Sequence, residues 1–353
     1  MAPEPGAVVV PAALAGERVD RAICTLTGLS RRVAAALVDS GAVSLDGSVV
    51  EQRSRRVSEG DRLEIVPKPS AKVDNAIGQS PTSPVEFAVV YEDEHVIVVD
   101  KPAGLVVHHG AGHHGGTLVD GLLERFPDLA ELGVGLEPSA DDASYLVDDV
   151  HVDPGRPGIV HRLDKGTSGL MVVGRTKSDV RSLTEQLGAR TAGRQYLALV
   201  AGKVVHDEGV VDAPVGRSAR MATRMAVTPS GRPARTAYRV LEHMSGPPVC
   251  TLVEATLETG RTHQVRVHMA AIGHPVGGDD RYGEMSRTMP LMATGTSPVD
   301  GPDTGLPPGR LFLHAHRLTI DHPTRGRVTW SSPLPPDLAS VLEARRGKGH
   351  AAV

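Results

Sequence analysis

The alternation of hydrophobic and polar positions divides the chain into a small N-terminal unit and a larger β-rich unit. In the first unit, apolar residues at positions 19, 23 and 26 recur at helical spacing, and Ser30 can cap a second helix that stops at Gly41. Short alternating runs then flank the dipeptide Asp46-Gly47, which is typical of a tight hairpin turn, and a further strand is predicted over 62–66. The pattern therefore predicts two helices followed by a small hairpin sheet.

From residue 85 onward the pattern changes to short runs of β-branched and other apolar residues. These runs predict strands over 96–99, 170–173, 196–200, 251–256 and 311–313, whereas the clearest helix is predicted over 177–187. Strands outnumber helices and do not alternate strictly with them. We therefore expect an α+β fold with a mixed, largely antiparallel sheet rather than a doubly wound parallel sheet.

Shifts in composition give the expected domain boundaries. We expect a flexible tail over 1–16, a small domain over 17–67, a linker rich in Pro and Ser over 68–84, a large domain over 85–340 and a second tail over 341–353. Two stretches of the large domain have the character of mobile surface insertions. One is acidic and covers 128–157, and the other is rich in Gly, Pro, Ser and Thr and covers 284–309.

Composition and charge narrow the classes of function. The 353 residues are 40% hydrophobic and 23% charged, as in ordinary globular proteins, and no apolar stretch is long enough to span a membrane. No basic segment followed by an apolar core begins the chain, so we expect no secretory signal and a cytoplasmic location. The net charge of −4 is unevenly distributed, since removing the eight acidic residues between Asp128 and Gly155 changes it to +4. The overall charge therefore does not exclude a nucleic-acid partner.

Clusters of basic residues indicate contact with nucleic acid. Arg31 and Arg32 begin the second predicted helix, where they add charge to its positive end, and Arg53 lies before the last strand of the small unit. An acid-free stretch between positions 213 and 237 contains Arg217, Arg220, Arg224, Arg232 and Arg235. A solvated basic face is the alternative interpretation of any one of these arginines, but their clustering favours contact with phosphates.

The segment with the strongest candidate chemistry lies between hydrophobic runs at 159–160 and 170–173. Its sequence over 158–170 is Gly-Ile-Val-His-Arg-Leu-Asp-Lys-Gly-Thr-Ser-Gly-Leu, a charged loop held at both ends by apolar segments. Asp164 stands between Arg162 and Lys165, whose charges favour the ionised carboxylate. A surface salt bridge on a turn is the alternative. The spacing excludes a kinase catalytic loop and a nucleophile elbow.

No metal site is expected. Histidines gather at positions 108, 109, 113 and 114, but their spacing matches no familiar zinc site and no Cys or carboxylate lies between them. The only two cysteines, Cys24 and Cys250, are far apart and have no paired spacing.

A series of motifs in this chain resembles those of the RluA-type pseudouridine synthases. The family signature is similar to residues 161–170, His-Arg-Leu-Asp-Lys-Gly-Thr-Ser-Gly-Leu. Further matching blocks are 100–108 (Asp-Lys-Pro-Ala-Gly-Leu-Val-Val-His), 194–198 (Arg-Gln-Tyr-Leu-Ala), 257–268 (Leu-Glu-Thr-Gly-Arg-Thr-His-Gln-Val-Arg-Val-His), 273–275 (Gly-His-Pro), 280–283 (Asp-Arg-Tyr-Gly) and 313–315 (Leu-His-Ala). The N-terminal unit resembles the αL RNA-binding domain first described in a ribosomal small-subunit protein. Together they resemble the RluD-like members, which modify large-subunit ribosomal RNA.

The resemblance implies an isomerisation of uridine to pseudouridine in structured RNA, without a cofactor. Asp164 would be the catalytic aspartate, which attacks the anomeric carbon or assists departure of the uracil. Arg261 would pair with this carboxylate, which needs such a partner when it is buried. Tyr196 would pack against the target base, and Arg162 would enter the RNA helix when the uridine is flipped out. Lys165 completes the expected substrate-binding residues.

Two other functions remain open at this point. A non-catalytic RNA-binding or ribosome-assembly factor could keep the fold, although it would have no need of Asp164, Tyr196 and Arg261 together. A nucleoside glycosidase with an Asp nucleophile would need a second carboxylate as general acid, which the motif lacks. We therefore expect a monomeric enzyme that acts on large-subunit ribosomal RNA, with transfer RNA as the less favoured substrate.

Overall fold

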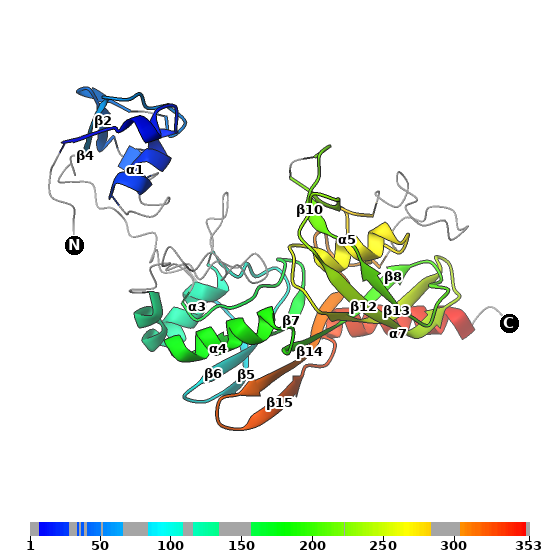
Figure 1. Cartoon of the computed structure of the whole chain (residues 1–353). Helices are drawn as coiled ribbons and strands as arrows, with labels where there is room; N and C mark the ends of the chain where they lie inside the picture. The colour runs from blue at the N-terminus through cyan, green and yellow to red at the C-terminus, as the bar shows by residue number, and fades with distance from the viewer. Residues whose placement is uncertain are drawn as a thin grey trace. The chain divides into compact units, whose positions relative to one another are not determined.

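The computed structural model describes residues 7–27, 34, 37–38, 41–50, 52–65, 84–108, 116–133, 157–221, 223–283 and 304–350. The chain divides into two compact units, Met1–Ile77 and Gly78–Val353. The first unit is blue in Figure 1, and the second runs from cyan to red. Each unit has a hydrophobic core of its own.

The small unit consists of helix α1 (Val19–Thr27), residues of a second helix, and a four-stranded sheet. Its strands are β1 (Ala7–Val9), β2 (Val43–Leu45), β3 (Ser48–Val49) and β4 (Arg62–Ile65), in the order β1-β4-β2-β3. The predicted hairpin is confirmed, because Asp46 and Gly47 both have the positive φ that a two-residue turn between β2 and β3 requires. Ala34, Leu37 and Val38 are helical within the second predicted helix.

The N-terminal tail expected over 1–16 is wrong for its second half. Strand β1 pairs antiparallel with β4, a short 3-10 helix η1 (Ala12–Leu14) follows, and Val10 is buried in the core of the small unit. The Pro and Ala content of this segment concealed the strand, because an edge strand pairs on one side only and tolerates such residues. The expected linker over 68–84 lies outside the described residues, except for Pro84.

A nine-stranded sheet forms the centre of the large unit. Its strands are β5 (Ala88–Glu92), β6 (Val96–Lys101), β7 (Ser168–Gly174), β8 (Gly193–Ala201), β9 (Glu208–Asp212), β12 (Arg235–Met244), β13 (Cys250–Leu257), β14 (Leu313–His322) and β15 (Gly326–Ser331). The order is β5-β6-β7-β14-β8-β13-β12-β9, with β15 paired to β14. Only the pair β14–β7 is parallel, so the α+β fold with a largely antiparallel sheet is confirmed. Strands β10 (Val215–Arg217) and β11 (Met225–Val227) form a separate hairpin.

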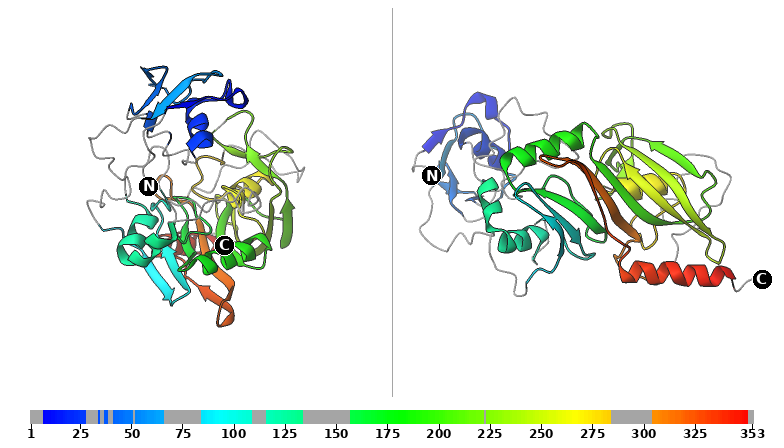
Figure 2. Two further views of the ribbon diagram at one scale, coloured as in Figure 1. Left: turned by 60° about the vertical axis from the view of Figure 1, so that its left-hand side comes forward. Right: turned by 90° about the horizontal axis from the view of Figure 1, so that it is seen from below.

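Helices pack on both faces of this sheet. Side chains alternate between the two faces along β8 and β13. Leu199 and Leu252 pack in one cluster with residues of α7 (Pro336–His350). Their neighbours Ala198 and Val253 belong to the core that contains residues of α5 (Gln264–Ala271). Helix α4 (Lys177–Gly188) packs against β7 and β14, and α3 (Leu118–Arg125) lies in the same half of the unit. Figure 2 shows α7 in red along the half of the sheet that contains β12.

The acidic insertion begins as part of the core. Residues 127–133 form a 3-10 helix, η2 (Pro127–Gly133), whose Leu129 and Leu132 are buried. Arg175 donates to Asp128 at 2.8 Å, so the first acidic residue of the insertion is held at the surface by an ion pair. The prediction of a mobile loop is therefore wrong for 128–133, and 134–156 lies outside the described residues.

The C-terminal parts of the chain also differ from expectation. Helix α7 continues to His350, so the tail predicted over 341–353 is wrong up to that residue. Leu342 packs in the apolar cluster beneath the helix, and Arg346 forms an ion pair with Glu242 of β12 at 2.6 Å. The end of the second insertion, 304–309, leads into strand β14, and Gly309 lies against Gly166 of the loop that carries Asp164. Residues 284–303 lie outside the described residues.

Candidate active site

The loop that carries Asp164 enters strand β7 through two close backbone contacts. A Cβ on Gly166 would lie 2.1 Å from the carbonyl oxygen of Gly309. Gly169 has a φ of +118°, and a Cβ there would lie 2.4 Å from the carbonyl oxygen of Ala315. Only glycine fits at either place, and the loop can therefore pack directly on the chain that leads into β14.

Polar contacts hold the same loop from two distant segments. Arg310 donates through Nη1 to the carbonyl of Gly166 at 3.0 Å, and its Nε donates to Asp337 of α7 at 2.6 Å. On the other side, the amide of Gly104 donates to the carbonyl of Lys165 at 2.7 Å. Gly104 of the 100–108 motif and Arg310, which is itself held by helix α7, thus both fix the backbone directly after Asp164.

The Asp164 carboxylate lies beside a buried ion-pair network. Arg266 Nη1 donates to Asp164 Oδ2 at 2.8 Å, while Nε and Nη2 of the same guanidinium donate to both oxygens of Asp279 at 2.7 and 2.9 Å. The Asp279 side chain is fully buried, whereas that of Asp164 is 17% exposed. His263 Nε2 lies 3.7 Å from Asp164 Oδ1.

This environment keeps Asp164 ionised. Burial alone would raise the pKa of the Asp164 carboxyl. The charge that His263 carries at the low pH where this carboxyl titrates, the charge and hydrogen bond of Arg266 and the charge of Arg162 together outweigh burial, so the pKa lies below its usual range. Burial also lowers the pKa of His263, against the attraction of Asp164. The imidazole is therefore neutral near pH 7, and Arg266 supplies the full positive charge next to the carboxylate.

The expected pairing of Arg261 with Asp164 is wrong. The guanidinium on the carboxylate belongs to Arg266, whereas Nε of Arg261 donates to the carbonyl of Pro233 at 3.1 Å. Both arginines lie in one motif block, five positions apart. Between them His263 takes a left-handed conformation with φ of 59°, and α5 starts immediately after it. This reversal of the backbone, which residue types alone do not reveal, selects Arg266.

Helix α5 is buried from Gln264 to Ala270, and only its last residue, Ala271, is partly exposed. Its alternating start, Gln-Val-Arg-Val-His, has the polar–apolar pattern of a strand, yet each polar side chain has partners inside the fold. Gln264 accepts from the hydroxyl of Thr259 at 2.7 Å and donates to Thr236 at 2.9 Å. His268 contacts Thr236 and the carbonyl of Ala213, both at 2.9 Å. These contacts fix the helix that carries Arg266.

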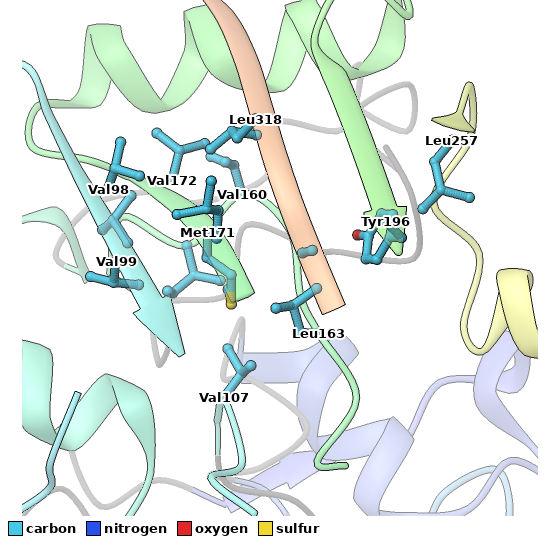
Figure 3. Packing of buried hydrophobic residues seen from close by; sticks show 14 of the residues in the cluster. Val98, Val99, Val107, Val160, Leu163, Met171, Val172, Tyr196, Leu257 and Leu318 are labelled. Atoms are coloured by element: carbon cyan, nitrogen blue, oxygen red, sulfur yellow. The ribbon is translucent and has the colours of Figure 1, made fainter. Parts of the chain in front are cut away.

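A pocket opens in front of Asp164 and contains the expected aromatic residue. Tyr196, on β8, is only 5% exposed. Figure 3 shows its ring beside Leu257, with Leu163 of the loop that carries Asp164 nearby. The lining residues are His161, Arg162, Leu163, Asp164, Thr167, Arg194, Tyr196, Leu257, Gly260, Arg261, Thr262, His263, Gln264, Val265 and Leu313. The structure therefore brings together three expected residues from distant motifs, Asp164, Tyr196 and Arg261.

Two expected substrate-binding residues lie at the exposed edge of the site. Arg162 is exposed and lines the pocket, and its Nη1 lies 3.4 Å from Nε2 of His108. Lys165 is also exposed but does not line the pocket. The charges that favour the ionised Asp164 carboxylate therefore include that of Arg162, one of the two flanking residues that we expected, together with that of Arg266, which we did not expect.

The expected RNA-binding arginines fall into three groups. Arg217 and Arg220 are exposed on the β10–β11 hairpin, where Arg224 is partly buried, and Figure 1 shows this hairpin projecting beyond α5. Arg235, in contrast, is ion-paired with Glu258, which directly follows strand β13.

In the small unit, Arg53 is exposed in the turn region between β3 and β4. Arg31 and Arg32 lie outside the described residues.

Sequence reasoning missed the residues that surround the Asp164 carboxylate. Arg266 and Tyr282 lie inside blocks that were recognised, but neither received a role, and Asp279 lies one residue before such a block. A usable signal was present for Arg266: a cation in a segment that is otherwise apolar requires a buried counter-charge. Nothing in the sequence identifies that counter-charge as Asp279.

Within the described part of the chain, no group of three or more His, Cys, Asp or Glu residues is arranged to hold a metal ion. Of the four clustered histidines only His108 is described. Among the same residues, no helix has both the length and the apolar character needed to cross a bilayer.

Comparison with known proteins gives two family matches. The model for RNA pseudouridylate synthase matches residues 95–271, and the model for the S4 domain matches residues 17–63. The chain is 40% identical to "Ribosomal large subunit pseudouridine synthase D" of Nitrosomonas europaea over 98% of its own length and 89% of that protein. It is 39% identical to the protein of the same name from Pseudomonas aeruginosa, over 96% and 95% of the two chains.

Solved structures show the same relationship. "Human RNA Pseudouridylate Synthase Domain Containing 1" superposes with a TM-score of 0.50 at 25% identity, covering 75% of this chain and 97% of that one. The family match, the near full-length relatives and the arrangement of the site agree. The chain therefore belongs to the RNA pseudouridylate synthase family of isomerases, which convert uridine to pseudouridine, and it carries an N-terminal S4 domain.

Proposed function

We propose that this protein isomerises specific uridines of large-subunit ribosomal RNA, with Asp164 as its catalytic carboxylate. The observation that carries the proposal is the ionised, Arg266-bound carboxylate of Asp164 at a pocket that Tyr196 also lines. The reaction breaks the bond from the sugar to a ring nitrogen, turns the uracil and forms a bond to a ring carbon. It transfers no electrons and no phosphoryl group, so it requires no redox cofactor.

The surroundings of Asp164 suit this reaction. An ionised carboxylate can attack the anomeric carbon or stabilise positive charge that develops there as the uracil leaves. Because Arg266 and the loop contacts from Arg310 and Gly104 fix the carboxylate before substrate arrives, little reorganisation remains for the reaction itself.

The target uridine must leave its stack to reach Asp164, which costs a few kcal/mol. Stacking on the ring of Tyr196 would return on the order of 1–3 kcal/mol. Arg162 is exposed and lines the pocket, where it can take the place of the flipped base in the RNA helix, and the exposed Lys165 of the same loop can contact the RNA as well. Arg261, inside the pocket, would contact the substrate rather than the carboxylate.

The choice of large-subunit ribosomal RNA rests on the names of the bacterial relatives and on the S4 domain. In this proposal Arg31, Arg32 and Arg53 of the small unit, with Arg217, Arg220 and Arg224 of the β10–β11 hairpin, contact phosphates. The enzyme acts as a monomer in the cytoplasm, where ribosomal RNA is assembled.

A non-catalytic RNA-binding factor is the alternative. A protein that only binds RNA has no use for a buried guanidinium aimed at an ionised carboxylate, because such a pair adds little to stability. A nucleoside glycosidase is disfavoured as well, since the second acidic residue near Asp164 is Asp279, whose oxygens are both bound to Arg266 and fully buried.

Pseudouridine mapping across total RNA tests the proposal. Cells that lack the gene should lose modification at specific uridines of the large-subunit RNA, and a wild-type copy should restore it, whereas an Asp164→Asn copy should not. Asp207→Asn is the matched control, because it makes the same chemical change at an exposed residue of the large unit. Restoration by Asp164→Asn would overturn the catalytic role, and loss of sites in transfer RNA alone would overturn the substrate.

A further inference from the structure

The side chain of His263 lies between the catalytic carboxylate and a buried tyrosine. Its Nδ1 is 2.7 Å from the hydroxyl of Tyr282, and its Nε2 is 3.7 Å from Oδ1 of Asp164. The imidazole is 17% exposed and lines the pocket, whereas Tyr282 is fully buried. The two ring nitrogens of His263 therefore face Tyr282 and Asp164, respectively.

The hydrogen bonds of Tyr282 determine which imidazole nitrogen carries the proton. The amide of Met225 donates to the Tyr282 hydroxyl at 3.1 Å, so this oxygen already acts as an acceptor. The hydroxyl can then donate its own proton to Nδ1 of His263, which accepts it when the ring proton is on Nε2. In the neutral ring the remaining proton is on Nε2, which faces Asp164.

The backbone at His263 is also unusual. The residue has a φ of 59°, in the left-handed region that most side chains avoid, and it stands at the N-cap of α5 without a side-chain capping hydrogen bond. Asn, Asp or Gly would suit both features better. A residue kept in an unfavourable backbone conformation beside a reactive group points to a role for its side chain.

We propose that His263 is a positioning residue that donates Nε2–H to Oδ1 of Asp164, while Arg266 holds Oδ2, and that Tyr282 fixes the required tautomer. The proposal rests on the catalytic role proposed for Asp164. The 3.7 Å separation exceeds a hydrogen bond, and substrate binding shortens it, as is common for catalytic contacts that tighten only in the complex. The two donors then fix both oxygens and the direction in which the carboxylate faces the sugar.

Charged and titratable groups approach Asp164 from several elements. Arg266 reaches it from α5, Arg162 from its own loop, and Lys101 from β6, where the buried ammonium donates to two backbone carbonyls. Of these neighbours only His263 is placed against Oδ1. Its removal therefore leaves one carboxylate oxygen without its donor while the other charges stay in place.

The test compares His263→Gln, His263→Asn and His263→Leu in the full-length protein, measured as single-turnover rates on a ribosomal RNA fragment. The Gln amide nitrogen can take the place of Nε2, whereas the Asn amide reaches only the place of Nδ1. We expect Gln to retain most of the rate and Asn and Leu to lose about 100-fold, because a shift of about 1 Å in a catalytic group has that effect. Affinity for the RNA should change little in all three.

A purely structural role predicts the opposite order. If His263 served only the turn before α5, Asn would be the best substitute, since it adopts the left-handed conformation most readily. Equal or better activity of His263→Asn than His263→Gln would therefore overturn the proposal. The acid limb of the rate profile gives a second readout: it should move to higher pH in His263→Leu, because the carboxylate loses one donor that favours its ionised form.

Tyr282→Phe tests the tautomer. This variant should slow the reaction in the wild-type background, because either nitrogen of His263 can then carry the proton. In the His263→Gln background, Tyr282→Phe should have no further effect on the rate, since an amide has no tautomer to fix. An equal loss of rate in both backgrounds would contradict the proposal that Tyr282 acts through His263. Asp164→Asn is measured in parallel. If this variant remains active, the proposed function fails. If Asp164→Asn is inactive but His263→Leu is fully active, only the positioning role of His263 is overturned.

Discussion

At the residue scale, one guanidinium links two carboxylates of different function. Arg266 binds both oxygens of Asp279, which is fully buried, and uses its remaining nitrogen for Asp164. The buried carboxylate would be costly without this partner, so Asp279 orients the arginine, and the arginine in turn holds the reactive group. The ring of Tyr282 packs 4.9 Å below the same guanidinium and restricts it further. The carboxylate for which we propose the catalytic role is thus positioned by Arg266, Asp279 and Tyr282, which are not among the residues that line the pocket.

This arrangement predicts different effects for the two arginines of the third motif block. A lysine at position 266 cannot bind Asp279 with two nitrogens and reach Asp164 as well, so Arg266→Lys should lower the single-turnover rate by about 100-fold, as for loss of a preorganised donor. Arg261→Lys should have a smaller effect on this rate and a larger one on RNA affinity. Trp330, the only tryptophan, reports by its fluorescence whether each variant is folded. A greater loss of rate in Arg261→Lys would contradict the assignment of the pair.

At the scale of elements, two hairpins at one end of the sheet depend on side chains for their contact. Strands β7 and β14 pair through only two residues each, and beyond them β14 pairs with β15 instead. The β5–β6 turn then meets the β14–β15 hairpin through Asp93, which lies 2.9 Å from Nε2 of His322, and through Tyr91, whose ring is 5.2 Å from that of Trp330. This cluster replaces the backbone hydrogen bonds that the diverging strands cannot make.

The cluster should make the large unit sensitive to acid. Burial alone would raise the pKa of Asp93, but hydrogen bonds from the Tyr91 hydroxyl and from the amides of Val96 and His95 lower it to about 2. Because the folded pKa is depressed, Asp93 stabilises the fold above its ordinary pKa of 3.8, and this contribution is lost as the pH falls from about 4 to 2. Asp93→Asn should therefore lower the free energy of unfolding by about 2 kcal/mol at pH 7, and by much less near pH 2.

Urea unfolding followed by Trp330 fluorescence measures this difference, because Trp330 belongs to the same cluster. Asp207→Asn, at an exposed position, is the control and should change the free energy of unfolding by less than about 0.5 kcal/mol. An Asp93→Asn effect that does not depend on pH would show that packing, rather than the charge, is responsible.

The β10–β11 hairpin gives a second prediction at this scale. If Arg217 and Arg220 contact phosphates, Arg217→Ala and Arg220→Ala should each reduce the slope of log affinity against log salt concentration by about 1. Arg181→Ala is the matched control, because Arg181 is equally exposed but lies on α4, in an ion pair with Glu185. Binding of a ribosomal RNA fragment at several salt concentrations measures the slopes, and unchanged slopes for both hairpin variants would remove this surface from the RNA interface.

At the scale of the whole molecule, the chain contains two units with separate cores. All described residues of the candidate active site belong to the large unit. The S4 domain therefore contributes to the reaction, in our proposal, through RNA binding alone. In this proposal the maximal rate depends on the large unit alone, whereas the affinity for RNA also depends on the small unit.

A chain that begins at Gly78 should fold and keep its catalytic rate at saturating RNA within a few-fold, while its affinity for the full ribosomal RNA substrate falls by at least about 10-fold as phosphate contacts are lost. Single-turnover measurements over a range of RNA concentrations separate the two constants. A truncated protein that is folded by Trp330 fluorescence but has a greatly reduced maximal rate would mean that the small unit takes part in assembling the active site.

The sequence by itself determined the local structure and the candidate for the reactive group. Hydrophobic periodicity located the main strands and α4, the Asp46-Gly47 turn fixed the small hairpin, and the loop around Asp164 carried its own motif, because all of these depend on neighbouring residues. Only the tertiary structure decided the partner of Asp164. Arg266 lies 102 positions away and Asp279 farther still, and their meeting depends on β14 lying between β7 and β8 and on the backbone reversal at His263. Contacts between distant segments follow from packing of the whole sheet, which residue type and spacing do not encode.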